Sequence, residues 1–205
     1  MTFRALTISR EYGSGGAEVA AIAANCLGWR LIDKGLLAEI SAKANVPEGD
    51  VAALDERRDP WLQRISRPIW GKGGDGVSDV LPVELFDADA EADVARTVIE
   101  EAYQAGNCVF VGRGSQCLLR HKPDVYRVLV YARWEDRVRR VQARVPPGAD
   151  VSSLLQSMDA RRLEYLRAHY GENGADPHLY DLLIDSRNQT EAAARLIVCA
   201  MELMK

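Results

Sequence analysis

The chain has 205 residues, and 47% of them are hydrophobic, which is enough to fill the core of one domain. Its 26 Lys and Arg residues are outnumbered by 30 Asp and Glu residues, which leaves a formal net charge of -4. This balance argues against binding nucleic acid through a broad basic surface, so a bound phosphate has to be held by a local group of arginines.

The sequence runs directly into segment 4–8 (RALTI) without a long apolar stretch, and it holds no run of 18 apolar residues. We therefore expect a cytoplasmic protein with no signal peptide and no membrane contact. Its four cysteines, Cys26, Cys108, Cys117 and Cys199, lie far apart with no CxxC pair and no metal-ligand spacing. This pattern predicts buried cysteines in a reducing compartment.

Short apolar runs alternate with helical patterns along the chain, which is typical of βαβ units and a parallel sheet. The predicted strands are Ala5–Ser9, Arg30–Ile32, Cys108–Val111, Val125–Tyr131 and Leu182–Asp185. Apolar residues recur with a helical period over 19–27 and 94–103, and a long helix is predicted over Val151–Tyr170. Each helix can therefore cover a face of the sheet.

One segment breaks this alternation. Residues 57–82 hold Pro60, Pro68, Gly71, Gly73, Gly74, Gly76 and Pro82. Proline and glycine at this density predict a mobile excursion from a single domain that otherwise spans residues 1–205.

A glycine-rich turn follows the first predicted strand and leads at once into a helix. It consists of Gly13, Ser14, Gly15 and Gly16. Such a turn presents backbone N–H groups and the positive end of the helix dipole to an anion, and glycine lets the backbone approach closely. The sequence therefore predicts a phosphate site here, and the alternative is a tight turn that binds nothing.

The turn departs from the standard phosphate-binding loop, which places Lys and then Ser or Thr after its last glycine. Here those positions are Gly16 and Ala17. Either another cation replaces the lysine or phosphoryl transfer is weak. Arg10 is the nearest candidate cation, and its alternative is a surface ion pair with Glu11 or Glu18.

Two further candidates follow predicted strands, at the sheet edge where open α/β sheets bind ligands. Arg113, between two glycines, can contact a phosphate through two nitrogens, or it can pair with a carboxylate to fix its loop. Asp33 can face the same crevice, or it can cap a helix that starts at Lys34.

Charged residues with helical spacing lie in the second half of the chain. Arg137, Arg140 and Arg144 share one helix face, and the alternative to a ligand role is a solvated face paired with nearby carboxylates. Asp159 and Arg162 have the i, i+3 spacing of a helix ion pair. The three histidines share no spacing, which argues against a zinc site, so we expect no protein metal centre.

Five segments, in this order, resemble the cytidylate kinase-like family, a branch of the P-loop nucleoside monophosphate kinases. They are Ile8–Gly16 (ISREYGSGG), Leu27–Gly35 (LGWRLIDKG), Cys108–Gly114 (CVFVGRG), Asp159–Tyr165 (DARRLEY) and Asp176–Asp185 (DPHLYDLLID). The resemblance spans nearly the whole chain. It implies a three-layer α/β/α sandwich with five parallel strands in the order 2-3-1-4-5, and an arginine lid over about 137–165.

The resemblance also implies phosphoryl transfer from ATP, with Mg²⁺, to a nucleoside monophosphate. The glycine turn would hold the donor phosphates under the lid arginines, while Arg113, Asp159 and Arg162 match acceptor-binding positions and Asp33 could orient the acceptor. An acceptor-site serine is replaced by Lys34 and an acceptor-site arginine by Glu39. Two alternatives stay open: a regulatory nucleotide-binding protein without turnover, and a kinase for another small acceptor.

Overall fold

The computed structural model describes residues 2–33, 35–36, 88–187 and 189–204. The chain divides into two compact units, one made of residues 1–32 with 106–205 and the other of residues 33–105. The excursion predicted at 57–82 lies outside the described residues, as do Lys34 and Glu39.

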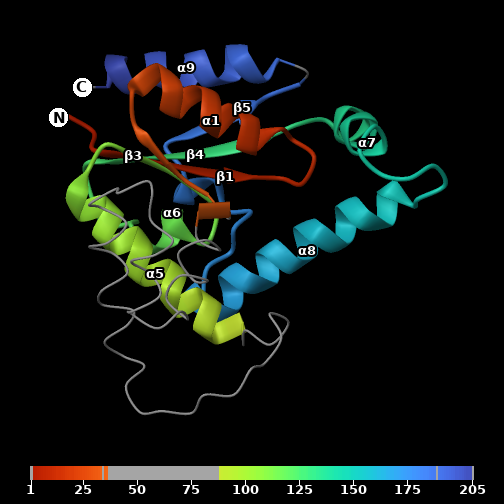
Figure 1. Cartoon of the computed structure of the whole chain (residues 1–205), viewed down its shortest axis with the longest axis horizontal. Helices are drawn as coiled ribbons and strands as arrows, with labels where there is room; N and C mark the ends of the chain where they lie inside the picture. Colours follow the sequence, from red (N-terminus) through yellow and green to blue (C-terminus); the bar gives the residue numbers. More distant parts are fainter. Residues whose placement is uncertain (1, 34, 37–87, 188, 205) are drawn as a thin grey trace, which may run out of the picture. The chain divides into compact units, whose positions relative to one another are not determined.

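The first unit is built on a parallel sheet of five strands (Figure 1). The strands are β1 (Ala5–Arg10), β2 (Arg30–Ile32), β3 (Cys108–Val111), β4 (Val125–Tyr131) and β5 (Leu182–Asp185). They lie in the order β2-β3-β1-β4-β5, which confirms the expected topology. Ala5 of the central strand β1 pairs with Cys108 on one side and Val125 on the other. The continuous apolar runs reflect burial of both faces of these strands.

One face of the sheet is covered by α1 (Gly16–Leu27) and α9 (Thr190–Leu203), which lie side by side in Figure 1. Leu6 and Ile8 of β1 are fully buried in one apolar cluster with residues of both helices, including Ile197. This cluster is the main core of the unit. Burying these side chains supplies most of the free energy that holds the helices on the sheet.

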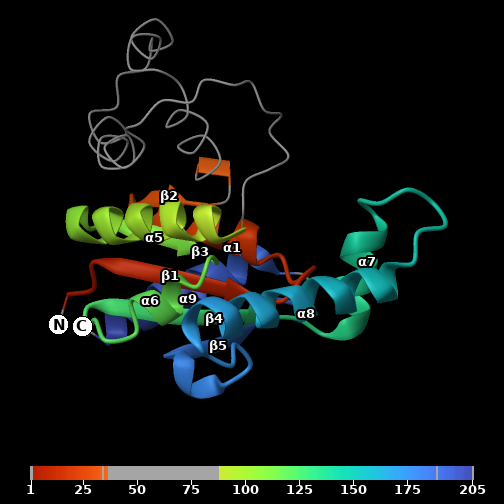
Figure 2. The same cartoon turned by 90° about the horizontal axis from the view of Figure 1, so that it is seen from below.

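The opposite face carries the short helix α6 (Ser115–Leu118) and the C-terminal part of α8 (Val151–Tyr170) (Figure 2). Cys117, Leu166 and Tyr180 form a second buried cluster there. The first unit therefore has helix, sheet and helix layers, as the resemblance implied.

Helix α7 (Trp134–Gln142) follows β4 and packs against the first half of α8. Val141, Val151 and Leu155 are buried between them. Both helices extend beyond the carboxyl ends of the strands (Figures 1 and 2). This helical hairpin is the region predicted as a lid.

The second unit contributes α5 (Ala88–Ala105) to the described residues. Its buried side chains recur with a helical period and include Ala95, Val98, Ile99 and Ala102, which confirms the helix predicted over 94–103.

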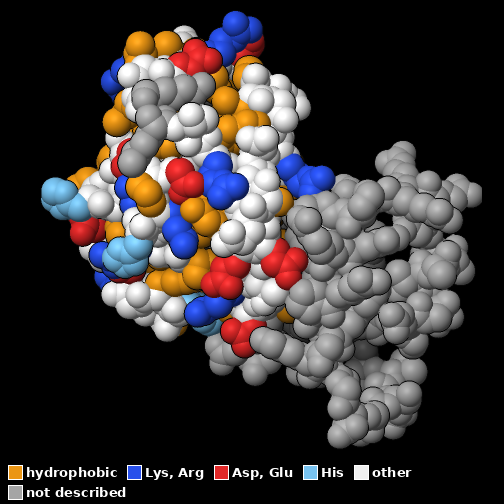
Figure 3. Space-filling model, turned by 90° about the vertical axis from the view of Figure 1, so that its left-hand side faces the viewer, with side chains coloured by type: hydrophobic (Ala, Val, Ile, Leu, Met, Phe, Trp, Pro, Cys, Tyr) orange, Lys and Arg blue, Asp and Glu red, His pale blue; other side chains and the backbone are white. Residues whose placement is uncertain are grey.

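The described surface carries charges of both signs. Acidic and basic side chains of the described residues are interspersed on the face shown in Figure 3. None of the described helices is long and apolar enough to cross a bilayer.

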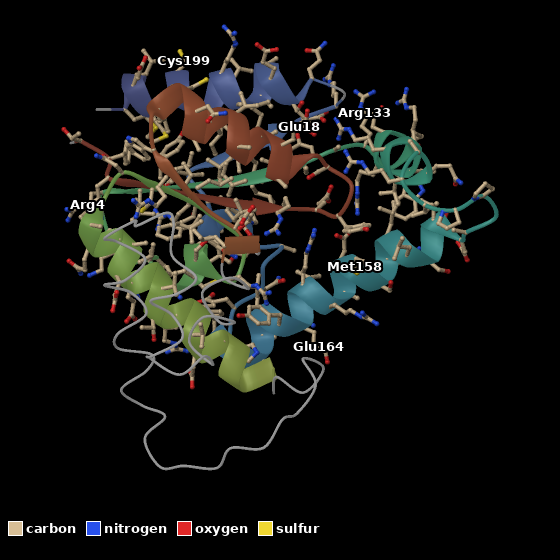
Figure 4. All side chains as sticks on the ribbon, in the orientation of Figure 1. Arg4, Glu18, Arg133, Met158, Glu164 and Cys199 are labelled. Carbon is tan, nitrogen blue, oxygen red and sulfur yellow. The ribbon has the colours of Figure 1, made fainter. Side chains whose placement is uncertain are left out.

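The cysteines differ from the prediction. All four belong to the described residues and are reduced thiols, but only Cys108 and Cys117 are buried. Cys26 of α1 is exposed. Cys199 of α9 is exposed as well (Figure 4). The prediction of four buried cysteines was wrong because each of these helices packs on the sheet with one face only.

The two classes of cysteine should react differently with an aromatic disulfide reagent at pH 8. Burial raises the pKa of Cys108 to about 12 and that of Cys117 to about 11, so neither forms an appreciable amount of thiolate. We expect two fast equivalents in the native protein and four after denaturation. Cys26→Ser and Cys199→Ser should each remove one fast equivalent, and four fast equivalents in the native protein would contradict the burial.

Candidate phosphate-binding site

The glycine turn lies between the carboxyl end of β1 and the start of α1. Gly13 and Gly15 have φ values of 80° and 78°, in the left-handed region that favours glycine. A Cβ atom at Gly13 would lie 3.0 Å from Val141 Cγ2, and one at Gly15 would lie 2.8 Å from Thr190 Cγ2. Both glycines are therefore required by the backbone conformation and by close packing against neighbouring elements.

The carbonyl oxygens along the loop from Arg10 to Gly15 are all held by hydrogen bonds, several of them from distant parts of the chain. Each carbonyl from Arg10 to Gly15 accepts a hydrogen bond. The Arg10 carbonyl accepts from Arg162 Nη1 (3.0 Å), that of Glu11 from Ser14 N and Oγ (3.3 and 2.9 Å), and that of Tyr12 from Arg137 Nε (2.7 Å). The Gly13 carbonyl accepts from Arg140 Nη1 (3.2 Å), that of Ser14 from Ser186 Oγ, and that of Gly15 from Val19 N (3.0 Å). This bonding fixes the direction in which each peptide group of the turn points.

The N–H groups of the turn show the opposite pattern. Within the described part of the chain, the N–H groups of Gly13, Gly15, Gly16 and Ala17 meet no acceptor. The last two belong to the first turn of α1, where the helix dipole is positive. A concave set of N–H donors at a helix N-terminus can bind an anion such as phosphate.

Arg140 adds a cation to these N–H groups. Its Nη1 donates to the Gly13 carbonyl (3.2 Å) and to Ser186 Oγ (3.3 Å), whereas its buried Nη2 finds no partner among the described residues. Burial lowers the pKa of Arg140, against the opposing effect of Asp136 and Glu18. A half-buried guanidinium whose buried nitrogen has no partner favours a bound anion.

Arg137 has a different environment from the one predicted for a solvated helix face. Only 5% of the residue is exposed. Its Nη1 lies 3.4 Å from Glu11 Oε2, its Nη2 pairs with Asp159, and its Nε donates to the Tyr12 carbonyl. The solvated-face alternative is wrong for this arginine, because all three of its guanidinium nitrogens have partners, two in the loop and one, Asp159, in α8.

Asp159 and Arg162 of α8 hold the same loop from the other helix of the hairpin. Asp159 Oδ1 accepts a hydrogen bond from the Tyr12 N–H (2.8 Å) and lies 3.8 Å from Arg162 Nη1. Arg162 also lies over the Tyr12 ring, 5.5 Å from its centroid, and burial lowers its pKa. The helix ion pair is thus present, and both residues contact the loop as well.

Arg113 lies at the end of β3 in a turn of three left-handed residues. Gly112, Arg113 and Gly114 have φ values of 71°, 56° and 69°. Such a conformation is unusual for arginine and costs energy, which indicates a constrained turn. The Arg113 carbonyl accepts a hydrogen bond from the Tyr170 hydroxyl (3.0 Å). The turn is therefore anchored to α8 at the carboxyl edge of the sheet.

The remaining predicted residues are Asp33 and Arg144. Asp33 belongs to the second unit, and its Oδ1 accepts a hydrogen bond from the Leu36 N–H (3.0 Å), which confirms the capping alternative. Arg144 is exposed beyond the end of α7. A ligand role for either residue stays a prediction.

Sequence reasoning missed Ser186, which is buried directly after β5. Its Oγ donates to the Ser14 carbonyl and accepts from Arg140. Its position after a parallel strand was the only signal in the sequence. Figure 4 labels Arg133, the residue before α7, and Glu18, in the first turn of α1.

Together, the 2-3-1-4-5 parallel sheet, the glycine turn before α1 and the arginine-bearing hairpin after β4 define a P-loop kinase fold. The chain belongs to the cytidylate kinase-like family, whose model matches residues 5–188. A comparison with curated proteins found no match.

Solved structures support the fold. An uncharacterized protein from Eubacterium ventriosum is 19% identical, with a TM-score of 0.66 over 97% of this chain and 98% of that chain. Shikimate kinase from Acinetobacter baumannii, in complex with shikimate, is 16% identical, with a TM-score of 0.55 over 100% and 96% of the two chains. A gluconokinase from Sinorhizobium meliloti is 14% identical, with a TM-score of 0.55 over 100% and 95%.

Proposed function

We propose that this protein transfers the γ-phosphoryl group of ATP to a small acceptor, with a nucleoside monophosphate as the first candidate. Membership of a kinase-like family and the P-loop kinase fold support a phosphotransferase. The observation that carries the proposal is the set of N–H groups without acceptors in the described glycine turn, next to the buried Nη2 of Arg140. Phosphoryl transfer needs mainly such positioning and charge stabilisation.

In this proposal the residues fall into two groups. Gly13, Ser14, Gly15 and Gly16 hold the donor phosphates, with Arg140 as a direct contact and Arg137 holding the loop in shape. Arg10 and Arg144 complete the candidate cations of the donor site. Arg113, Asp159 and Arg162 remain the candidates for the acceptor side in the first unit, and Asp33 in the second.

The residues fit a nucleotide phosphate better than they fit a dedicated magnesium site. The standard loop supplies a Ser or Thr hydroxyl to Mg²⁺. This chain has Ala17 at that position, and its described residues form no cluster of three metal-ligating side chains. Mg²⁺ usually binds through substrate phosphates and one or two carboxylates, so it would enter with ATP and neutralise the phosphate charge.

Two alternatives rest on specific residues. Gly16, at the position of the loop lysine, favours a regulatory protein that binds nucleotide without turnover. Lys34 and Glu39, at acceptor positions, favour a kinase for a different small acceptor. A γ-phosphate transfer assay across nucleoside monophosphates and small hydroxyl compounds separates the three possibilities.

Binding to the loop is tested by titrating ATP, ADP and AMP into the purified protein, with calorimetry as the readout. Arg140→Ala should weaken ATP binding about ten- to hundredfold, the scale of a charge-assisted hydrogen bond. Arg139→Ala is the control, because Arg139 is exposed on the same helix and pairs with Asp136. No ATP binding at millimolar concentration, or equal affinity in the two variants, would contradict the proposed site.

A further inference from the structure

The glycine at position 16 has a steric cause. Gly16 is the first residue of α1, and its φ is not in the left-handed region. A Cβ atom there would lie 2.5 Å from Arg10 Cβ and 3.0 Å from Arg10 Cγ. Carbon atoms do not approach so closely without displacement. The side chain of Arg10 therefore excludes every side chain at position 16, including the lysine of the standard loop.

The other end of Arg10 meets a second glycine. A Cβ atom at Gly112 would lie 3.0 Å from Arg10 Cζ and 3.4 Å from Arg10 Nη2. Gly112 follows β3, and its N–H donates to the Ile8 carbonyl of β1 (3.1 Å). The arginine side chain thus runs from the end of β1, past the start of α1, to the end of β3, with a glycine at each end.

This path lies between two turns at the carboxyl edge of the sheet. One is the glycine turn, and the other is the left-handed turn from Gly112 to Gly114. The Arg10 carbonyl is held by Arg162 Nη1 (3.0 Å), which fixes the point from which the side chain starts. A guanidinium in this place adds positive charge beside the glycine turn, at the carboxyl edge of the sheet where open α/β sheets bind ligands.

We infer that the cation of the phosphate loop has moved from position 16 to position 10, so that Arg10 contacts the transferred phosphoryl group and Gly16 and Gly112 make room for it. This inference rests on the proposed phosphotransferase function. The competing explanation is that Arg10 only braces the end of β1 against β3.

The steric part is tested by a double-mutant cycle on stability. Gly16→Ala should lower the melting temperature of the wild-type chain, because its Cβ would overlap Arg10. The same change in an Arg10→Gly background should have little effect, since alanine is a favourable residue in the first turn of a helix. Equal losses in both backgrounds would overturn the steric coupling.

The claim that Arg10 supplies the positive charge is tested by removing Arg10 and placing a lysine at position 16. Four full-length chains are compared for ATP affinity: wild type, Arg10→Gly, Gly16→Lys and the Arg10→Gly/Gly16→Lys double variant. We expect each single variant to lose about ten- to hundredfold in affinity, by loss of a charge-assisted contact or by steric displacement of it. The double variant should bind ATP within about threefold of the wild type, because a lysine at position 16 contacts phosphate in the standard loop.

The outcomes separate the inference from the proposed function. Restoration by a lysine six residues further along the chain is not expected of a residue that only braces two strands. Wild-type ATP affinity in Arg10→Gly, or a double variant no better than that single variant, overturns the inference and leaves the proposed function standing. If Arg10→Gly does not fold, Arg10→Met replaces it for the loss of ATP affinity alone, because its Cβ and Cγ still exclude a side chain at position 16. Wild-type ATP affinity in Arg10→Met then overturns the inference. A wild-type chain that binds no ATP refutes the proposed function itself.

Discussion

Replacing Arg137 with alanine is expected to lower the free energy of unfolding by about 2–4 kcal/mol, because it removes the buried arginine of a half-buried ion-pair network. The Arg137 side chain is 7% exposed and lies between the carboxylates of Glu11 and Asp159. Its loss leaves Asp159 at the Tyr12 N–H without its main countercharge. Chemical denaturation followed by circular dichroism measures the effect.

The control for this prediction is Arg139→Ala on the same helix. The Arg139 side chain is 64% exposed, and its ion pair with Asp136 is a surface pair, so the expected change is below about 0.5 kcal/mol. ATP affinity should fall in Arg137→Ala and stay unchanged in Arg139→Ala, since of these two arginines only Arg137 contacts the loop. Equal stability of the two variants would show that the network contributes little to folding.

Gly114→Ala is expected to destabilise the protein by about 2–4 kcal/mol, from a left-handed backbone cost of 1–2 kcal/mol and an overpacking cost of similar size. Gly114 has a φ of 69°, and a Cβ atom there would overlap the ring of Tyr170. Tyr170 packs against the second buried cluster, which includes Cys117, and its hydroxyl donates to the Arg113 carbonyl. The change should therefore disturb the turn that carries Arg113.

Gly171→Ala separates the two contributions. Gly171 has a φ of 67°, and nothing lies within 4 Å of a Cβ atom built there. It should lose only the backbone part, about 1 kcal/mol. Thermal unfolding of both variants gives the difference, and a Gly171→Ala loss as large as that of Gly114→Ala would remove the steric explanation.

The five strands were predicted to within one residue because their signals are local. Apolar runs bounded by glycine, proline and polar residues mark where each strand starts and stops. Only β1 extends further than predicted, to Arg10. The strand order came from the family resemblance, since pairing partners such as Ala5 and Val125 are far apart in the sequence.

Only the features of the site that depend on residues close together in the chain were predicted. The spacing of Arg137, Arg140 and Arg144 is the same for a solvated helix face and for a face that packs on a loop. Burial of Arg137 depends on Glu11, Tyr12 and Asp159, none of which is its neighbour in the chain. Helical periodicity gives no information on such partners.

The sequence by itself therefore determined a parallel α/β protein with a glycine turn before its first helix, because backbone propensity and apolar patterning act over a few residues. The tertiary structure alone decided what surrounds that turn. Arg137, Arg140 and Arg162 hold its carbonyls from two later helices, and Arg10 occupies the space beside Gly16. These contacts depend on how distant segments pack in three dimensions. Packing fixes which arginines hold the loop, and it leaves Arg140 Nη2 without a partner among the described residues.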